Sequence, residues 1–134
     1  MLCAHVFEDM PVGKAIFVTM PKSTYSEFLS SVSEGKAKQI GRLDAERVAK
    51  SIILAKHGEI TKEAIIEHLR LFAERAGYGE YREVSDNGKR IITIMHEFGL
   101  QGSALFAAHA ETLFQMIGLR PRMTTTEGAL VIEI

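Results

Sequence analysis

The chain has 134 residues, the usual size of one domain, and 46% of them are hydrophobic, which is enough to form a core. Because 16 basic side chains nearly balance 17 acidic ones, no overall charge attracts it to nucleic acid or an anionic membrane, and any basic surface must be local. The single cysteine, Cys3, excludes an internal disulfide and a zinc site made of cysteines. With no apolar run near the roughly 18 residues of a membrane span and no secretion signal, we expect a cytoplasmic protein without membrane association.

The N-terminal part predicts a strand followed by a short helix. Residues 1–13 show no sustained period and are interpreted as an N-terminal arm. The stretch Lys14–Met20 is rich in strand-forming residues, and the proline after it cannot donate a hydrogen bond to a sheet. Thr24 and Glu27 then have the spacing of a capping box, which predicts an amphipathic helix that ends near Gly35.

Two further helices are predicted after an exposed connection. The connection is residues 34–42, which contain two glycines and three basic side chains among few apolar ones. Asp44 is expected to cap a helix that stops at Gly58, and Thr61 to cap a second one that stops at Gly77. Because the link between them is short, these helices should pack as a hairpin.

The C-terminal half predicts a hairpin, a helix and a second hairpin. Asn87-Gly88 is the strongest short-range signal for a two-residue hairpin turn, because both positions tolerate positive φ. A helix is expected to start at Ser103 and stop at Gly118, and Glu127-Gly128 marks the second turn. The expected strands are 78–85, 89–96, 122–126 and 129–134.

Together these elements predict an α+β fold. Two hairpins joined by a helix form one antiparallel sheet with the helix across one face, and the helical hairpin covers the remaining apolar surface. We expect a single domain over residues 14–134, which could divide into a strand-helix unit, 14–43, and a core, 44–134.

The tract from His96 to Ser103 is the most suggestive of a binding site. It joins a strand end to a helix start, where the backbone N–H groups at Gly99 and Gly102 could bind a carboxylate or phosphate and His96 could donate to it. Glycines are equally needed simply to turn a strand into a helix, so this second interpretation stays open. The expected ligand-binding residues are His96, Gly99, Gly102, Ser103 and His109.

No catalytic residue, metal site or cofactor is predicted. His96 and His109 could meet as metal ligands only if the strand end faces the helix, and no His-Glu-x-x-His pattern occurs. His109 is expected to be partly buried and His68 to face solvent. Ser103 lacks the Gly-x-Ser-x-Gly elbow of a nucleophile, so the chain is not expected to be an enzyme, although that possibility stays open.

Local basic residues offer a second kind of site. Lys36, Lys38 and Arg42 lie in the predicted connection, and Lys14 and Lys22 flank the first strand. Such a cluster beside a strand-helix unit could contact phosphates. Charged connections are also commonly just solvated.

The stretch Ile16–Leu29 resembles the start of a ribbon-helix-helix (CopG-like) regulator, in which a strand precedes a proline-initiated helix. The resemblance implies a homodimer whose paired strands read DNA through outward side chains, here Ala15, Phe17 and Thr19. Residues 88–134 are similar to the C-terminal domains attached to such regulators in archaea, and more loosely to the vinyl-reductase-type ligand-binding fold. The expected DNA contacts are Lys14, Phe17, Thr19 and Lys22.

Three functional hypotheses follow. The first is a non-catalytic regulator, dimeric and DNA-binding, whose C-terminal part senses a ligand or mediates assembly. The second is a small-molecule-binding domain or enzyme with its site around His96–Ser103. The third is a protein-protein interaction module that uses an apolar patch such as Phe7, Phe17 and Phe28.

Overall fold

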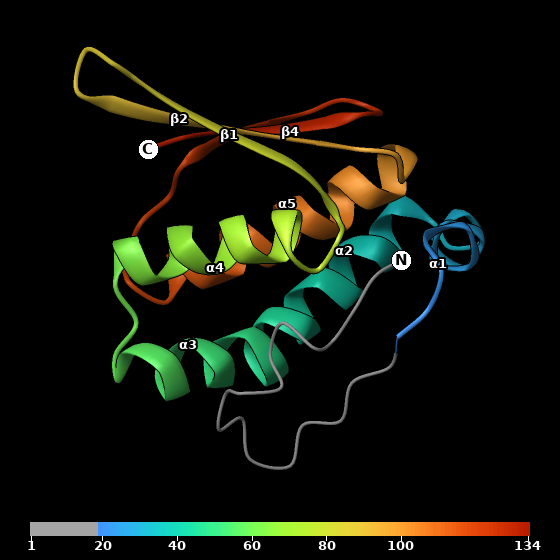
Figure 1. Cartoon of the computed structure of the whole chain (residues 1–134), viewed down its shortest axis with the longest axis horizontal. Helices are drawn as coiled ribbons and strands as arrows, with labels where there is room; N and C mark the ends of the chain where they lie inside the picture. The colour runs from blue at the N-terminus through green and yellow to red at the C-terminus, as the bar shows by residue number, and fades with distance from the viewer. Residues whose placement is uncertain (1–18) are drawn as a thin grey trace.

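A computed structural model of the chain describes residues 19–134 (Figure 1). The predicted arm, residues 1–13, and all of the predicted strand Lys14–Met20 except its last two residues lie outside this range. In chain order the elements are α1 (Lys22–Ser30), α2 (Glu34–Asp44), the π-helical turn η2 (Ala45–Ala49), α3 (Lys50–His57), α4 (Lys62–Glu74), β1 (Gly79–Asp86), β2 (Lys89–His96), α5 (Gly99–Gln115), β3 (Arg122–Thr125) and β4 (Ala129–Glu133).

Both predicted hairpins are present and form one sheet. The four strands lie in the order β1-β2-β4-β3, and every neighbouring pair is antiparallel. The turn between β1 and β2 has φ of 49° at Asn87 and 80° at Gly88, the left-handed conformation that an Asn-Gly turn allows. The α+β fold class is therefore confirmed.

The core lies between this sheet and the helices, which all lie below the sheet in Figure 1. Ile92 and Ile94 of β2 stand opposite Ile132 and Leu130 of β4, and all four side chains are fully buried. Alternate residues of a strand point to one face, so these four form one apolar layer. Helix α5 closes this layer with Phe106, Ala110, Leu113 and Phe114, all fully buried.

The predicted exposed connection over residues 34–42 is wrong, because this stretch is helix α2. Ser33 caps it, with its hydroxyl oxygen accepting a hydrogen bond from the Lys36 N–H at 3.0 Å. Ala37 and Gly41 are buried against α5, and a Cβ atom at Gly41 would lie 2.2 Å from the carbonyl oxygen of Leu105. Small residues four positions apart allow two helix backbones to approach closely. In the sequence alone the same glycines resemble those of a loop, which is why the helix is not predicted.

The predicted helix start at Asp44 is also wrong. Asp44 has helical φ and ψ of −62° and −42°, and the chain continues from α2 through the π-helical turn into α3 as one rod. The predicted stop is confirmed, since Gly58 ends α3 in the left-handed conformation with φ of 78°. The predicted cap of α4 is confirmed as well, because the Thr61 hydroxyl accepts a hydrogen bond from Ala64 N–H at 3.1 Å.

Helices α1 and α5 also differ from prediction at their boundaries. Helix α1 follows Pro21 directly, so Thr24 lies inside the helix and does not cap it, and the helix ends before Gly35. Helix α5 begins at Gly99 rather than Ser103, because the Gly102 N–H already donates to the Phe98 carbonyl. None of the helices between residues 19 and 134 is long and apolar enough to span a membrane.

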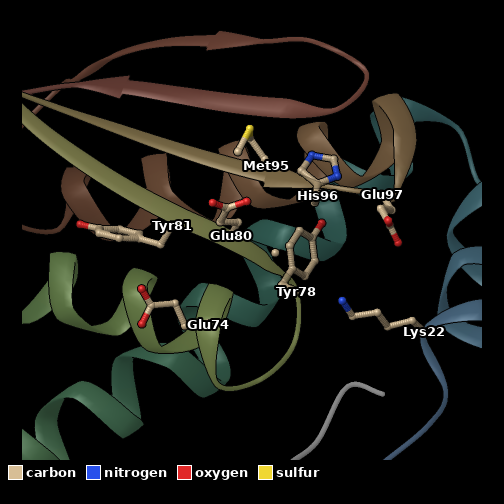
Figure 2. A pocket seen from close by; sticks show the side chains of 9 residues that line it. Lys22, Glu74, Tyr78, Glu80, Tyr81, Met95, His96 and Glu97 are labelled. Atoms are coloured by element: carbon tan, nitrogen blue, oxygen red, sulfur yellow. The ribbon is translucent and has the colours of Figure 1, made fainter.

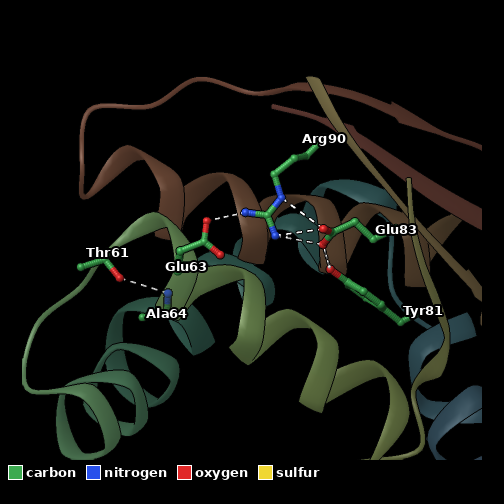
Figure 3. Close-up of polar contacts among 6 residues, drawn as sticks. All are labelled: Thr61, Glu63, Ala64, Tyr81, Glu83 and Arg90. Carbon is green, nitrogen blue, oxygen red and sulfur yellow. Dashed lines mark hydrogen bonds and ion pairs between the residues drawn. The ribbon is translucent and has the colours of Figure 1, made fainter. Parts of the chain in front are cut away.

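A surface network joins α4 to the first hairpin (Figure 3). Arg90 of β2 donates to both carboxylate oxygens of Glu83 on β1, with a closest distance of 3.0 Å, and also contacts Glu63 at the start of α4. The Tyr81 hydroxyl donates to Glu83 at 2.7 Å. This bidentate arrangement holds the hairpin against the helix layer.

Replacing Arg90 with methionine is expected to lower the free energy of unfolding by about 1 kcal/mol, at the upper end for a partly exposed ion pair. The reason is that Arg90 is 24% exposed in its side chain and serves two carboxylates. Arg82→Met is the matched control, since Arg82 is 66% exposed and pairs with Glu80 alone, so its effect should be near zero. Urea denaturation of both variants measures the difference, and equal effects would contradict the role of the network.

Candidate functional site

A hollow of about 630 Å³ opens where α1, the end of α4 and the ends of β1 and β2 meet (Figure 2). This volume lies within the range of small-molecule sites. In Figure 2 the Lys22 side chain reaches from α1 toward Tyr78, while His96 and Glu97 stand at the end of β2. Its lining residues are Lys22, Glu74, Tyr78, Gly79, Glu80, Tyr81, Met95, His96 and Glu97.

His96 lines the hollow and is held in one neutral tautomer. Its Nδ1 atom accepts a hydrogen bond from the Phe98 N–H at 3.1 Å, so the ring proton must sit on Nε2. Nε2 then donates to the Ser103 hydroxyl oxygen at 2.8 Å. The Ser103 hydroxyl in turn donates to the Thr126 carbonyl at 2.5 Å, with the Ala129 carbonyl at 3.2 Å. Burial lowers the pKa of His96, which favours this neutral form.

The direction of these hydrogen bonds determines what the pair can do. A general base must accept the proton of the serine hydroxyl, but here His96 donates to Ser103 and the serine proton is committed to a backbone carbonyl. Ser103 is also fully buried. The pair therefore joins the end of β2, the start of α5 and the turn before β4, and it lacks the polarity of an activated nucleophile.

The two predicted glycines serve the turn into α5. A Cβ atom at Gly102 would lie 2.3 Å from the Cβ of Phe98 and 3.1 Å from the His96 ring, so only glycine fits beneath that ring. The Gly102 carbonyl accepts a hydrogen bond from the Tyr78 hydroxyl at 2.7 Å. Gly99 adopts a φ of 70°, which favours glycine. Neither glycine lines the hollow.

His109 lies away from this group and pairs with His68. The two Nε2 atoms are 3.2 Å apart and the rings stack with centroids 5.4 Å apart. The expectation that His68 faces solvent is wrong, since it is 4% exposed and His109 only 1%. The buried face of helix α4 is wider than the single apolar stripe that the sequence predicts. It includes His68 as well as the neighbouring Leu69. Within residues 19–134 no contact joins His109 to His96.

Asp44 completes a buried polar cluster at the junction of α2, α4 and α5. Its Oδ2 atom lies 3.0 Å from Nδ1 of His109, but off the direction of a good N–H hydrogen bond, so that nitrogen has no well-directed partner. Burial, together with the charge of His109, lowers the pKa of His68 to about 3. Burial raises the pKa of the Asp44 carboxyl, yet its contact with His109 and the charges of both imidazoles outweigh burial and lower it overall.

One hydrogen can lie between the two Nε2 atoms, so one ring can donate to the other. Asp44 is 36% exposed in its side chain and connects the pair to the surface. Among residues 19–134 no three histidine, cysteine or carboxylate side chains are arranged to hold a metal ion. The contacts of Asp44, His68 and His109 join α2, α4 and α5.

Ring contacts connect the hollow to the histidine pair. Tyr78 packs on His96 with ring centroids 5.6 Å apart and on Phe72 at 5.3 Å, and Phe72 lies 5.5 Å from His109. Tyr25 of α1 meets Phe98 edge-on at 5.1 Å. Aromatic contacts of this kind pack α4 and α5 against the strand ends, and Tyr25 is the ring through which α1 joins them.

Only two of the four predicted DNA-binding residues lie within residues 19–134. Lys14 and Phe17 lie outside the described residues, Thr19 is exposed, and Lys22 lines the hollow at the start of α1. A comparison of the sequence with models of known protein families finds no match, and a comparison with curated proteins finds none either.

Proposed function

We propose that the protein is a non-catalytic regulator that binds DNA as a homodimer inside the cell and responds to a small molecule held in the hollow. One observation carries this proposal. The hollow is lined by Lys22 of α1 on one side and by the ends of β1 and β2 on the other, so an occupant would contact both parts of the chain. Helix α1 directly follows the segment whose resemblance to ribbon-helix-helix regulators implies dimerisation and DNA contact.

The hydrogen bonds of His96 support a role without catalysis. The residues nearest the hollow with nucleophile and base chemistry, Ser103 and His96, have their protons committed in the wrong direction for acyl transfer. The polar and aromatic side chains that remain, such as Tyr81 and Glu97, are suited to binding.

A ligand can act on α1 because this helix is lightly attached. Among its residues only Leu29 is fully buried, and its other main core contact is the edge of the Tyr25 ring against Phe98 and Tyr78. A molecule that contacts Lys22 and Glu97 together would favour one position of α1 over others. Such a difference in contact free energy is what shifts a conformational equilibrium.

A thermal-shift screen with a panel of metabolites tests the ligand part of the proposal. A compound present at 100 times its Kd should stabilise the protein by about 2.7 kcal/mol and raise its melting temperature by several degrees. The shift should be lost in the double variant Lys22→Ala with Glu97→Ala, which removes one side chain from each wall. Lys62→Ala with Glu127→Ala, at exposed positions outside the hollow, is the matched control and should retain it.

Light scattering and a DNA shift assay test the remainder. A homodimer that retards duplex DNA is the expected result. A strict monomer that binds neither DNA nor any metabolite would end the proposal, and a multimer that binds neither would favour the protein-protein interaction module.

A further inference from the structure

The rod formed by α2, the π-helical turn and α3 carries most of the local positive charge. Residues 34–57, which form this rod, contain six basic and three acidic side chains, whereas residues 58–134 contain eight basic and eleven acidic ones. The net charge of the whole chain is therefore near zero because a positive segment and a negative segment offset each other. Of these three acids, Asp44 is turned inward to His109, which leaves Glu34 and Glu46 as the exposed ones.

Five of the six basic side chains of the rod are exposed and have no acidic partner among residues 19–134. Elsewhere in this part of the chain Arg70, Arg82, Arg90 and Arg122 are each within 4.0 Å of a carboxylate, and so is Lys56 at the end of the rod. Lys36 only donates to the Gln39 side chain, at 3.3 Å. The exposed residues without an ion pair on the rod are Lys36, Lys38, Arg42, Arg47 and Lys50.

The opposite side of the rod fixes which way these residues point. Ala37, Gly41, Ala45 and Ala49 recur every four residues, and all are buried. Because side chains four apart share one face of a helix, this row packs inward and the basic residues face away from it. Figure 1 shows α2 and α3 as one diagonal rod on the side of the molecule away from the sheet.

This arrangement fits a nucleic acid better than a membrane. A helix that lies in a lipid surface needs a continuous apolar face to insert. Most of the apolar side of this rod is buried in the protein, and only two large apolar side chains of the rod, Ile40 and Leu54, are exposed. Lys36 and Lys50 are separated by roughly 20 Å along the rod at 1.5 Å per residue. Duplex DNA carries one charge per about 1.7 Å of its axis, so a length of this size offers about a dozen phosphates.

We infer that the exposed face of α2, the π-helical turn and α3 binds the phosphate backbone of duplex DNA through Lys36, Lys38, Arg42, Arg47 and Lys50. This inference rests on the proposed function and names a surface for it distinct from the N-terminal strand. Phosphate contacts of this kind position a protein on DNA without reading its sequence. They supply affinity that depends strongly on salt.

Fluorescence anisotropy with a labelled duplex of mixed sequence, measured over a series of salt concentrations, tests the surface. The triple variant Lys38→Gln, Arg42→Gln and Lys50→Gln should weaken binding at low salt by on the order of 100-fold and reduce the slope of log K against log salt by about 2.7, or 0.9 per contact. Glutamine keeps a good helix propensity, so the fold should be retained. Circular dichroism and a urea midpoint check this.

The matched control is the triple variant Lys62→Gln, Lys89→Gln and Arg120→Gln. These three basic residues are exposed, lie outside the rod and form no ion pair within residues 19–134. It should change the affinity and the slope little. If the wild type binds duplex but both triple variants behave alike, the surface is wrong and the proposed function stands. If the wild type binds no duplex at low salt, both fail. Tighter binding to vesicles of anionic lipid or to single-stranded RNA would overturn the assignment to duplex DNA.

Discussion

Gly41→Ala is expected to lower the free energy of unfolding by at least about 2 kcal/mol and the melting temperature by roughly 6–8 °C. A Cβ atom at this position would lie 2.2 Å from the carbonyl oxygen of Leu105 and 3.1 Å from the backbone nitrogen of His109. These are backbone atoms of α5 and cannot rotate away, so the two helices must separate. The separation also draws Asp44, one turn further along, away from His109.

Gly35→Ala is the matched control for this variant. Gly35 lies in the same helix, and the nearest atom to its added Cβ would be the Ser33 hydroxyl oxygen at 3.9 Å. Without a clash, the better helix propensity of alanine should stabilise the protein by up to about 1 kcal/mol. Opposite signs for the two variants in urea denaturation are the expected result. Equal effects would mean that α2 and α5 are not in close contact at Gly41.

Acid is expected to destabilise the protein from about pH 6.5 downward, before its carboxylates titrate. His68 has a pKa of about 3 in the folded protein and an ordinary value of 6.5 when unfolded. Between these values the unfolded chain binds one more proton than the folded chain, so stability falls as the pH falls. The loss approaches about 1.4 kcal/mol per pH unit for one such histidine, or about 2.7 kcal/mol from pH 7.5 to pH 4.5.

Two other groups act in the same direction. Burial lowers the pKa of His96, so protonation of this ring also favours the unfolded chain. The pKa of Asp44 is lowered from an ordinary value of 3.8, so its stabilising effect is present above that pH and is lost only in stronger acid. The window from pH 4.5 to 6.5 therefore reports mainly on the buried histidines.

Urea denaturation at several pH values measures this dependence. His68→Gln removes the titrating group but keeps an amide that can donate to His109, so its slope should be shallower by close to one proton. His57→Gln is the control, because His57 lies at the surface with 27% of its side chain exposed, and it should follow the wild type. A wild-type stability that stays flat between pH 4.5 and 7.5 would contradict a buried neutral His68.

Those parts of the fold that depend on neighbouring residues are the ones that the sequence predicts well. Asn87-Gly88 fixes the first hairpin through its positive φ angles, and Gly58 with Thr61 fixes the boundary between two helices. Helix α2 is missed because its glycines resemble a loop until the backbone of α5 beside Gly41 is known. The presence of a helix thus depended here on a contact far away in the sequence.

The candidate site divides in the same manner. His96 and Ser103 are only seven positions apart, with Gly102 between them. The prediction that these residues lie together is therefore correct. His68 and His109 are separated by 41 positions, on two helices whose relative rotation no periodic pattern reveals. The only local sign that His68 is buried is its position next to Leu69. The same position is also compatible with a histidine at the edge of a solvent-exposed helix face.

The sheet order has a consequence for the chain while it is being made. Strand β4 lies between β2 and β3, so the inner edge of β2 has no partner until β4 has left the ribosome. At ordinary rates of translation this interval is roughly 2–8 s. During it a strand with Ile92 and Ile94 presents open backbone groups, which is the condition under which nascent chains pair with one another. Early docking of α5 against β2 would protect that strand's apolar face but leave the edge free.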